Sequence, residues 1–360
     1  MEELEARFLL NASSSFNFEQ QNRILHQFET AQNFFKHEAQ AKEFVHLKNW
    51  DSFQKTCDRL IHDQCLNRLF DQGVHFLLKE DDSYPSHLQH INCPPHLLYL
   101  KGEIPKNSSF GISIVGTRRP TIYGRQMSQL FGTELASQGM TIISGLAKGI
   151  DALALSAAVQ THGKVIAFLG TGIDRVYPSE NAKLFDKISK SGCLISEYPP
   201  GAAPLKHHFP WRNRLISAWG LGVLVVEAGL PSGTLVTVKW ALDQGKDCFA
   251  IPGPANSEAS RGNHQMIRDG AFLVERPEEI LDFYQDLVSA HRTQEITPKD
   301  EFIEEGNELG LNHQPQSIDT LMDLSGLDYT TLTRKLNQAI ISGQVQKHPG
   351  ESYSLIDLKN

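Results

Sequence analysis

Three glycine-rich loops in the middle of the chain carry the residue types that bind phosphate. They are Gly116-Thr117-Arg118-Arg119-Pro120, Ser144-Gly145-Leu146-Ala147-Lys148-Gly149 and Gly170-Thr171-Gly172. Glycine lets the backbone turn sharply and brings N–H groups close to an anion, and a following helix adds the positive end of its dipole. One such loop alone is explained equally well by turn residues and solvated arginines. Three in succession predict a phosphate-binding rim with Arg118, Arg119 and Lys148 as its charges.

A second cluster mixes cations with aromatic rings. It reads Lys206-His207-His208-Phe209-Pro210-Trp211-Arg212-Asn213-Arg214. An unpaired strand needs both features, because its bases stack on rings while cations follow its backbone, and each stacked base contributes about 1–3 kcal/mol. This pattern therefore predicts binding to a single strand. The alternative interpretation is that Phe209 and Trp211 are core residues and that Arg214 is paired inside the protein, for instance with Glu227.

The motifs of metal sites and of common enzymes are missing from the sequence. His207-His208 has no carboxylate or cysteine at ligand spacing, so we predict no metal. No complete dinucleotide-binding fingerprint, ATP-binding phosphate loop or serine nucleophile elbow occurs. Asp151, Asp174 and Glu227 follow predicted strands, but Asp151 falls at a helix start, where capping explains it. We predict a protein that is not an enzyme and has no cofactor.

Length and composition favour an ordinary globular protein. A chain of 360 residues exceeds what one core usually serves, so one large domain with one or two smaller ones is expected. The net charge is −8, but it is segregated: residues 111–220 hold twelve Lys or Arg against six Asp or Glu, whereas 295–308 are strongly acidic. A local basic surface is therefore compatible with the acidic total.

The sequence also favours a cytoplasmic protein without membrane contact. No run of about 18 apolar residues appears, and the first residues lack the pattern of a signal peptide. The cysteines are odd in number, scattered and never closely paired, which predicts reduced, mostly buried thiols; they are Cys57, Cys65, Cys93, Cys193 and Cys248.

Short apolar runs, each ended by glycine and followed by a helical pattern, fill the region from about 110 to 287. The runs are 112–115, 141–143, 165–169, 193–195, 223–226 and 248–251. Strands that are apolar at nearly every position belong to a parallel sheet covered on both faces. We predict an extended Rossmann-like α/β domain, doubly wound and mostly parallel, with its ligand site beyond the carboxyl ends of the strands.

The flanking regions predict smaller domains. Residues 1–75 have apolar residues at helical spacing, which indicates a helical domain of the sterile-alpha-motif or helix-hairpin-helix type. The core would then span 76–287, beginning with an extended, proline-rich connector. An acidic linker is expected over 288–315. The order helix, turn, helix and hairpin in 316–360 is typical of a winged-helix-like domain.

The spaced motifs resemble, in their order, those of the DNA processing protein A (DprA/Smf) family. The match runs from about Tyr84 to Ala271, and its motifs are Gly116-Thr117-Arg118, Ser144-Gly145 with Gly149-Ile150-Asp151, residues 169–174 with Tyr177-Pro178, Ser196-Glu197, residues 209–214, Glu227-Ala228 with Ser232-Gly233-Thr234, and Ala250-Ile251-Pro252-Gly253. As a series of about eight motifs the likeness is specific, unlike any single loop. The flanking domains also resemble the longer form of that family.

The resemblance implies a function and partners. It implies binding of single-stranded DNA without strong sequence preference, protection of incoming DNA, homodimerisation through the core, and loading of the RecA recombinase during natural transformation. Arg118 and Lys206 would neutralise phosphates, and Phe209 would stack on a base. The same resemblance gives supporting positions in the strand site, which are Gly116, Thr117, Arg119, Ser144, Gly145, Lys148, Arg212, Asn213 and Arg214. It leaves open that Arg212 or Arg214 braces the sheet.

The chain departs from the family pattern in the second loop. The usual second glycine and arginine of its Ser-Gly-Gly-Ala-Arg-Gly loop appear as Leu146 and Lys148, and a histidine expected after Ile150-Asp151 is replaced near Leu155. Only arginine grips a phosphate through a planar fork, so the contact at Lys148 is expected to be weaker or differently oriented.

Two other hypotheses compete. The first is a nucleotide phosphoribohydrolase of the lysine-decarboxylase-like type, but residues 230–237 lack the diglycine and glutamate of its Pro-Gly-Gly-x-Gly-Thr-x-x-Glu motif. The second concerns the last domain, whose predicted helix over 329–342 has only Arg334 and Lys335 as basic residues. That is few for a helix in the major groove, so we expect protein contact or weak DNA affinity there.

Overall fold

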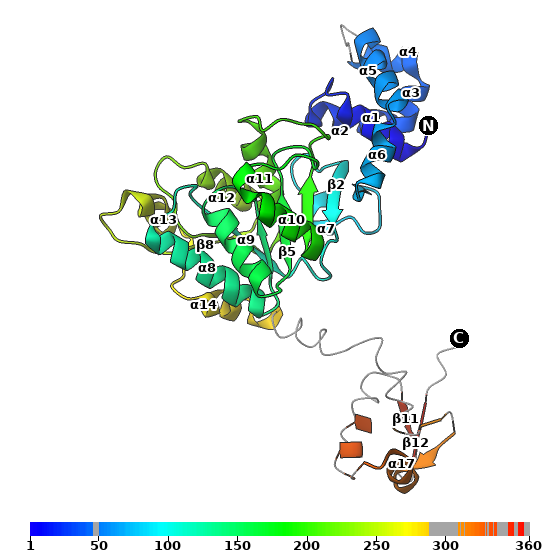
Figure 1. The fold of residues 1–360 in the computed structure, drawn as a ribbon, viewed down its shortest axis with the longest axis vertical. Helices are drawn as coiled ribbons and strands as arrows, with labels where there is room; N and C mark the ends of the chain where they lie inside the picture. The colour runs from blue at the N-terminus through cyan, green and yellow to red at the C-terminus, as the bar shows by residue number, and fades with distance from the viewer. Residues whose placement is uncertain are drawn as a thin grey trace. The chain divides into compact units, whose positions relative to one another are not determined.

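A computed structural model describes residues 1–45 and 50–287, and beyond them 309, 311–312, 314–327, 329, 331–333, 335–336, 345–348 and 352–355. The chain divides into two compact units, Met1–Phe283 and Tyr284–Asn360. The first unit contains both the N-terminal helices and the predicted sheet (Figure 1). The domain boundaries drawn from the sequence stay predictions.

A mostly parallel sheet forms the centre of the first unit (Figure 1). Its order, in the described part of the chain, is β1-β2-β6-β5-β4-β3-β7-β8-β9. All neighbours from β6 to β9 are parallel, while β2 pairs antiparallel with β1 and with β6. The strands are β1 Val74–Leu78, β2 Leu97–Gly102, β3 Gly111–Val115, β4 Thr141–Ser144, β5 Val165–Phe168, β6 Cys193–Ser196, β7 Gly222–Val225, β8 Asp247–Ala250 and β9 Phe272–Leu273. This confirms the predicted α/β class.

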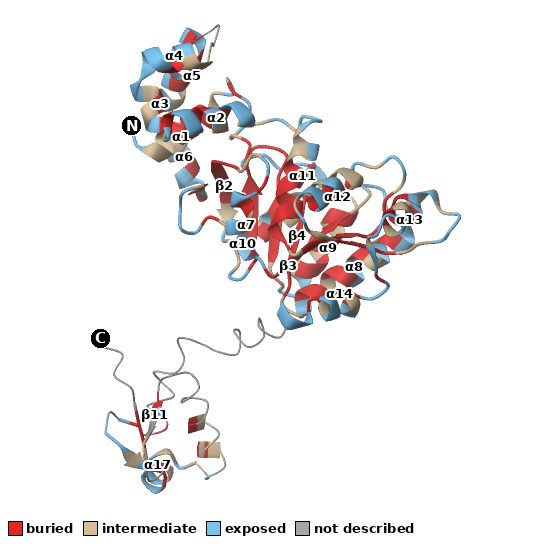
Figure 2. Cartoon of the chain, turned by 180° about the vertical axis from the view of Figure 1, so that it is seen from behind, coloured by how far each residue is buried: buried red, intermediate tan, exposed pale blue. Residues whose placement is uncertain are grey.

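The chain order reverses between β3 and β7, so the helices cover both faces of the sheet. Right-handed crossovers that run in opposite directions along a sheet lie on opposite faces. Accordingly α8 packs on α9 and α9 on α10, whereas α11 packs on α12. The helices of this region are α7 Ser86–Gln89, α8 Ile122–Ser137, α9 Ile150–Gln160, α10 Ala182–Ser191, α11 His208–Trp219, α12 Thr234–Asp243, α13 Arg261–Arg268 and α14 Pro277–Phe283. The central strands β3, β4, β5, β6 and β7 are buried at every position (Figure 2).

Within residues 1–45 and 50–73, six helices precede the sheet and confirm the predicted helical character of the N-terminal region. They are α1 Glu3–Ala12, α2 Phe18–Phe28, α3 Ala31–Lys36, α4 Glu38–Val45, α5 Trp50–His62 and α6 Cys65–Asp71. Asn17 begins α2 with a capping box to Gln20, which satisfies two free N–H groups. The rings of Phe16, Phe34 and Phe53 pack edge to face inside this helical group.

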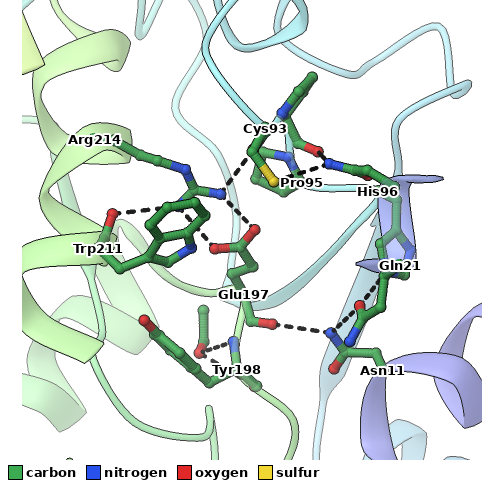
Figure 3. A network of polar contacts seen from close by, with 12 residues as sticks. Asn11, Gln21, Cys93, Pro95, His96, Glu197, Tyr198, Trp211 and Arg214 are labelled. Atoms are coloured by element: carbon green, nitrogen blue, oxygen red, sulfur yellow. Dashed lines mark hydrogen bonds and ion pairs between the residues drawn. The ribbon is translucent and has the colours of Figure 1, made fainter. Parts of the chain in front are cut away.

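Buried polar groups join the N-terminal helices to the sheet (Figure 3). The Tyr99 hydroxyl donates to Asn11 Oδ1 over 2.8 Å, and Asn11 Nδ2 donates to the Glu197 carbonyl over 3.4 Å. His96 Nε2 bonds Gln21 Oε1 at 2.6 Å. Because each buried group needs a partner, this network fixes how the helices dock on the sheet.

Buried histidines predict an acid-sensitive fold. Burial lowers the pKa of His96 to about 3 and that of His87 to about 4. The unfolded chain therefore binds protons at these positions below a pH of about 6.5 while the folded chain does not, so the free energy of unfolding falls as the pH drops from 6.5 toward 4. Urea titrations at several pH values measure this slope. We expect His96→Asn to flatten it, and an unchanged slope would contradict the assignment.

In the second unit, the described residues include a small sheet, the helix α17, and further helical positions at 329, 331–333 and 335–336. The strands β10 Gln316–Ser317, β12 Ser352–Leu355 and β11 Val345–His348 are antiparallel in that order, and α17 spans Ile318–Ser325. Gly326 ends α17 in the left-handed conformation, with a φ of 67°. The predicted second helix over 329–342 and the acidic linker over 288–315 lie largely outside the described residues. The winged-helix-like assignment stays a prediction.

Across the described residues, no helix combines the length and the apolar character that a membrane crossing requires.

Candidate nucleic-acid interface

The loop after β3 is held by backbone hydrogen bonds to neighbouring segments, and its arginines are exposed. Thr117 N donates to the Glu227 carbonyl at 2.8 Å, and the Thr117 carbonyl accepts from Ile150 N at 3.2 Å. Gly149 lies beneath this loop with a φ of +81°, and a Cβ there would come within 2.4 Å of the Thr117 carbonyl oxygen. Only glycine fits such a position. Arg118 and Arg119 at the loop tip are exposed.

Glu227, a carboxylate that follows β7, holds the start of α8. Its two oxygens accept from Thr121 N at 2.8 Å and from Thr121 Oγ1 at 2.6 Å, and its side chain is 3% exposed. Thr121 in turn caps α8 by accepting from Gly124 N at 3.1 Å. Both oxygens of Glu227 are therefore used to position the loop that bears Arg118.

The loop after β4 is tied to the core through buried groups. Gly145 N donates to Asp151 Oδ2 at 3.1 Å, and its carbonyl accepts from Arg212 Nη1 at 2.8 Å. Burial raises the pKa of the Asp151 carboxyl, and the positive charge of Arg212 opposes that rise. Ser144 is fully buried, and its hydroxyl donates to the Ile114 carbonyl at 2.6 Å. Ser144, expected among the supporting positions of the strand site, is therefore buried with its hydroxyl proton already used inside the protein.

Lys148 has an exposed side chain at the tip of the second loop. Its ammonium group is paired with the carboxylate of Glu180, from the short 3₁₀ helix Ser179–Asn181. Sequence reasoning missed Glu180 because it lies 32 residues further along the chain. A phosphate at this place must compete with that carboxylate.

Phe209 is the point where the predicted clusters meet. The Arg118 guanidinium lies 5.3 Å from the centroid of the Phe209 ring, within the range of a cation–π contact. A Cβ added at Gly170, in the third glycine loop, would come within 2.8 Å of the same ring. Tyr177, whose role the sequence reasoning missed, places its ring 5.5 Å from that of Phe209. Phe209 is half-buried, and Lys206, three residues earlier in the chain, is exposed.

The structure corrects the predicted roles of Arg212 and Arg214, which are 3% and 0% exposed. Arg212 donates to the carbonyls of Gly145 and Phe168 and so ties two strand ends together. Arg214 grips Glu197 through two hydrogen bonds of 2.8 and 2.6 Å (Figure 3). The internal pairing considered for Arg214 exists, but its partner is Glu197 and not Glu227. Neither guanidinium faces solvent, so Arg212 and Arg214 are not positioned to contact a DNA strand.

Asn213 lies between these buried arginines and Trp211 directly precedes them, both at intermediate exposure. The Asn213 Oδ1 accepts from Arg212 Nε at 3.2 Å. The Arg214 guanidinium lies 4.3 Å from the Trp211 ring centroid. Asn213 is half-buried, but its side-chain oxygen is bonded to Arg212. The other predicted site residues that are exposed or half-buried are Gly116, Thr117, Arg118, Arg119, Lys148, Lys206 and Phe209, and we call them the rim.

The fold and the rim define a class: a Rossmann-like α/β protein with cations and an aromatic ring beyond the carboxyl ends of its parallel strands. The family model of DNA recombination-mediator protein A matches residues 75–285. The chain belongs to this family, whose curated members carry the names DprA and Smf.

The alignments with curated relatives cover about 60% of this chain. Protein Smf from Escherichia coli (strain K12) is 44% identical over 217 residues, 60% of this chain and 58% of that protein. DNA processing protein DprA from Streptococcus pneumoniae is 40% identical over 221 residues, 61% of this chain and 78% of that protein. The alignments with Smf from Escherichia coli and from Synechocystis span only 58% and 53% of those proteins.

Solved structures show the same fold. The X-ray structure of DNA processing protein A from Streptococcus pneumoniae superposes with a TM-score of 0.62 at 33% identity, covering 76% of this chain and 95% of that one. DNA processing protein A from Helicobacter pylori, described for its single-stranded DNA binding mode, gives a TM-score of 0.54 at 28% identity and covers 59% and 96% of the two chains.

Proposed function

We propose that this protein binds single-stranded DNA at the rim without strong sequence preference. The observation that supports this proposal most directly is that Arg118 lies over the ring of Phe209. A group suited to phosphate and a group suited to base stacking therefore lie at one place. The Helicobacter pylori relative, which is described as binding single-stranded DNA, shares this fold.

The chemistry of the rim suits a backbone with stacked bases. Arg118, Arg119 and Lys206 are exposed cations that would neutralise phosphates. Phe209 offers a ring, and stacking tolerates every base because each has a π face. A sequence-specific reader would need side chains aimed at base edges, whereas this site is built from loop glycines, cations and a ring.

The wider role follows from the family. We propose that the bound strand is protected from degradation in the cytoplasm, that the protein acts as a homodimer, and that it loads the RecA recombinase during natural transformation. These assignments rest on family membership.

The experiment that tests the proposed function compares strands directly. Full-length protein is titrated with matched single- and double-stranded oligonucleotides across a salt series, and its mass is measured in parallel. Three phosphate contacts predict that the logarithm of the single-strand affinity falls with a slope of about −2 against the logarithm of salt. Tighter binding to the duplex, or an affinity independent of salt, would overturn the proposal. A monomeric mass in the bound state would overturn the dimer.

Glu180 is expected to weaken binding by occupying Lys148. Glu180→Gln should raise the single-strand affinity severalfold and steepen the salt slope by up to about one unit, because Lys148 becomes free to contact a phosphate. The matched control is Asp186→Asn, which removes an exposed negative charge from α10, beyond the Lys148 pair. Equal effects of the two variants would show that only the overall charge matters.

The phosphoribohydrolase alternative depends on a free acid near the strand ends. Glu227 has both oxygens bonded to Thr121 and holds α8. This favours a positioning role for Glu227. Release of free base from a nucleoside monophosphate, abolished in Glu227→Gln, would reverse the ranking of the two functions.

A further inference from the structure

A pocket of about 700 Å³ lies between the N-terminal helices and the core. From the N-terminal side it is lined by residues 16–19 and by Asn11 and Gln21, and from the core side by residues after β6 and at the start of α11. Figure 3 shows Tyr198 and Trp211 on the core side and Asn11 and Gln21 on the helices. The volume falls in the range of small-molecule sites.

Aromatic rings form the walls of this pocket. Phe18, the first residue of α2, lies parallel to Trp211 within 5°, with 6.3 Å between centroids, and 5.4 Å from the Tyr198 ring. Tyr198 stacks on His208 at 4.0 Å and donates its hydroxyl to the His208 carbonyl at 2.9 Å. The buried Arg214 guanidinium lies 4.3 Å from the centroid of the Trp211 ring. The rings are therefore held in place before any ligand arrives, which lowers the entropy cost of binding.

The charges of the pocket select the part of a strand that enters it. The described lining residues include the carboxylate of Glu19 but no lysine or arginine, so the lining offers a phosphate neither of these cations. Asn17, another residue of the lining, contributes an exposed amide. Rings and amides suit nucleobases, which stack and form hydrogen bonds at their edges.

One short segment of the chain, residues 205–209, contributes to both the pocket and the rim. Leu205, His207 and His208 line the pocket, while Lys206 and Phe209, interleaved with them, belong to the rim. A strand whose phosphates contact Lys206 would therefore present its next bases to the pocket. We infer that the pocket between α2 and α11 takes unpaired bases of the strand held on the rim, so that the N-terminal helices complete the DNA site. This inference rests on the proposed function.

The test uses Phe18→Ala with two lengths of oligothymidylate, about 5 and about 15 nucleotides. Phe18→Ala should weaken binding of the longer strand about 10-fold, because one stacking surface is lost, and should leave the shorter strand unchanged. Abasic sites near either end of the longer strand should weaken binding to the unaltered protein but not to Phe18→Ala. Phe18→Leu, which keeps the apolar contact that docks α2, should give the same length dependence. Phe70→Ala, a 47% exposed ring of α6 outside the pocket, is the matched control.

Arg118→Ala separates this inference from the proposed function. It should weaken binding of both lengths. If it does so while Phe18→Ala and Phe18→Leu affect neither length, or both lengths equally, the pocket inference is overturned and the rim stands. If Arg118→Ala changes neither affinity, the proposed function itself fails.

Discussion

Replacing Glu197 by alanine is expected to lower the free energy of unfolding by about 3–5 kcal/mol. Arg214 is 0% exposed, and Glu197 supplies both of its charge-assisted hydrogen bonds (Figure 3). Without that carboxylate, a full positive charge stays buried with only the carbonyls of Cys93 and Trp211 as hydrogen-bond acceptors. Urea unfolding of the variant measures the loss.

An exposed ion pair provides the control for Glu197. Glu258 pairs with Arg261 at 3.0 Å, but the two side chains are 79% and 58% exposed. Solvent screens such a pair, so Glu258→Ala should change the stability little. Similar losses for the two variants would contradict the assigned role of burial. Arg214 also packs against Trp211, which forms a wall of the pocket. Glu197→Ala should therefore weaken binding of the longer oligothymidylate more than binding of the shorter one.

The second large effect is expected from two exposed cations of the rim, Arg118 and Lys206. Arg118→Ala and Lys206→Ala should each weaken single-strand binding about 10-fold, and together about 100-fold, because each removes one charge-assisted phosphate contact. Each should also reduce the salt slope by about one unit, whatever the sequence of the strand. Fluorescence anisotropy across a salt series measures both quantities.

Lys190→Ala is the matched control for these cations. Lys190 is an exposed lysine in the last turn of α10. Since α10 runs back against the strand direction, its end lies at the opposite edge of the sheet from the rim. The control should leave affinity and slope unchanged. A loss as large as that of Arg118→Ala would mean that net charge, and not the rim, governs binding.

The sheet and the place of the rim were predictable from the sequence. Fully apolar runs such as 112–115 and 223–226 correspond to the buried parallel strands β3 and β7. Because parallel strands all end at one edge, the residues that follow them had to come together there. This explains why Arg118 and Phe209, far apart in the chain, meet as the two motifs suggested.

The buried arginines were not predictable from local pattern. Arg212 and Arg214 alternate with polar and aromatic residues, as exposed cations do. Their partners include Glu197, 17 residues earlier, and the Cys93 carbonyl, 121 residues earlier, so only the packed structure reveals them. A guanidinium can be buried where a carboxylate and backbone carbonyls accept its hydrogen bonds, because they offset the cost of desolvation.

The antiparallel edge and the pocket also escaped sequence reasoning. The strand β2 lies in the segment predicted as an extended, proline-rich connector, but nothing in that pattern specified antiparallel pairing with β6. The pocket depends on docking α2 against α11 through Phe18 and Trp211, whose rings lie 193 positions apart in the sequence. Periodicity within either helix carries no information about such a contact.

The most direct test of the central claim is a photochemical crosslink. A single strand that carries a photoreactive thymine analogue is bound to the full-length protein, irradiated and mapped by mass spectrometry. The account predicts a crosslinked peptide that contains Phe209, lost in Phe209→Ala. Crosslinks confined to residues 316–360, or to α10 and the edge of the sheet at which its last turn lies, would contradict it.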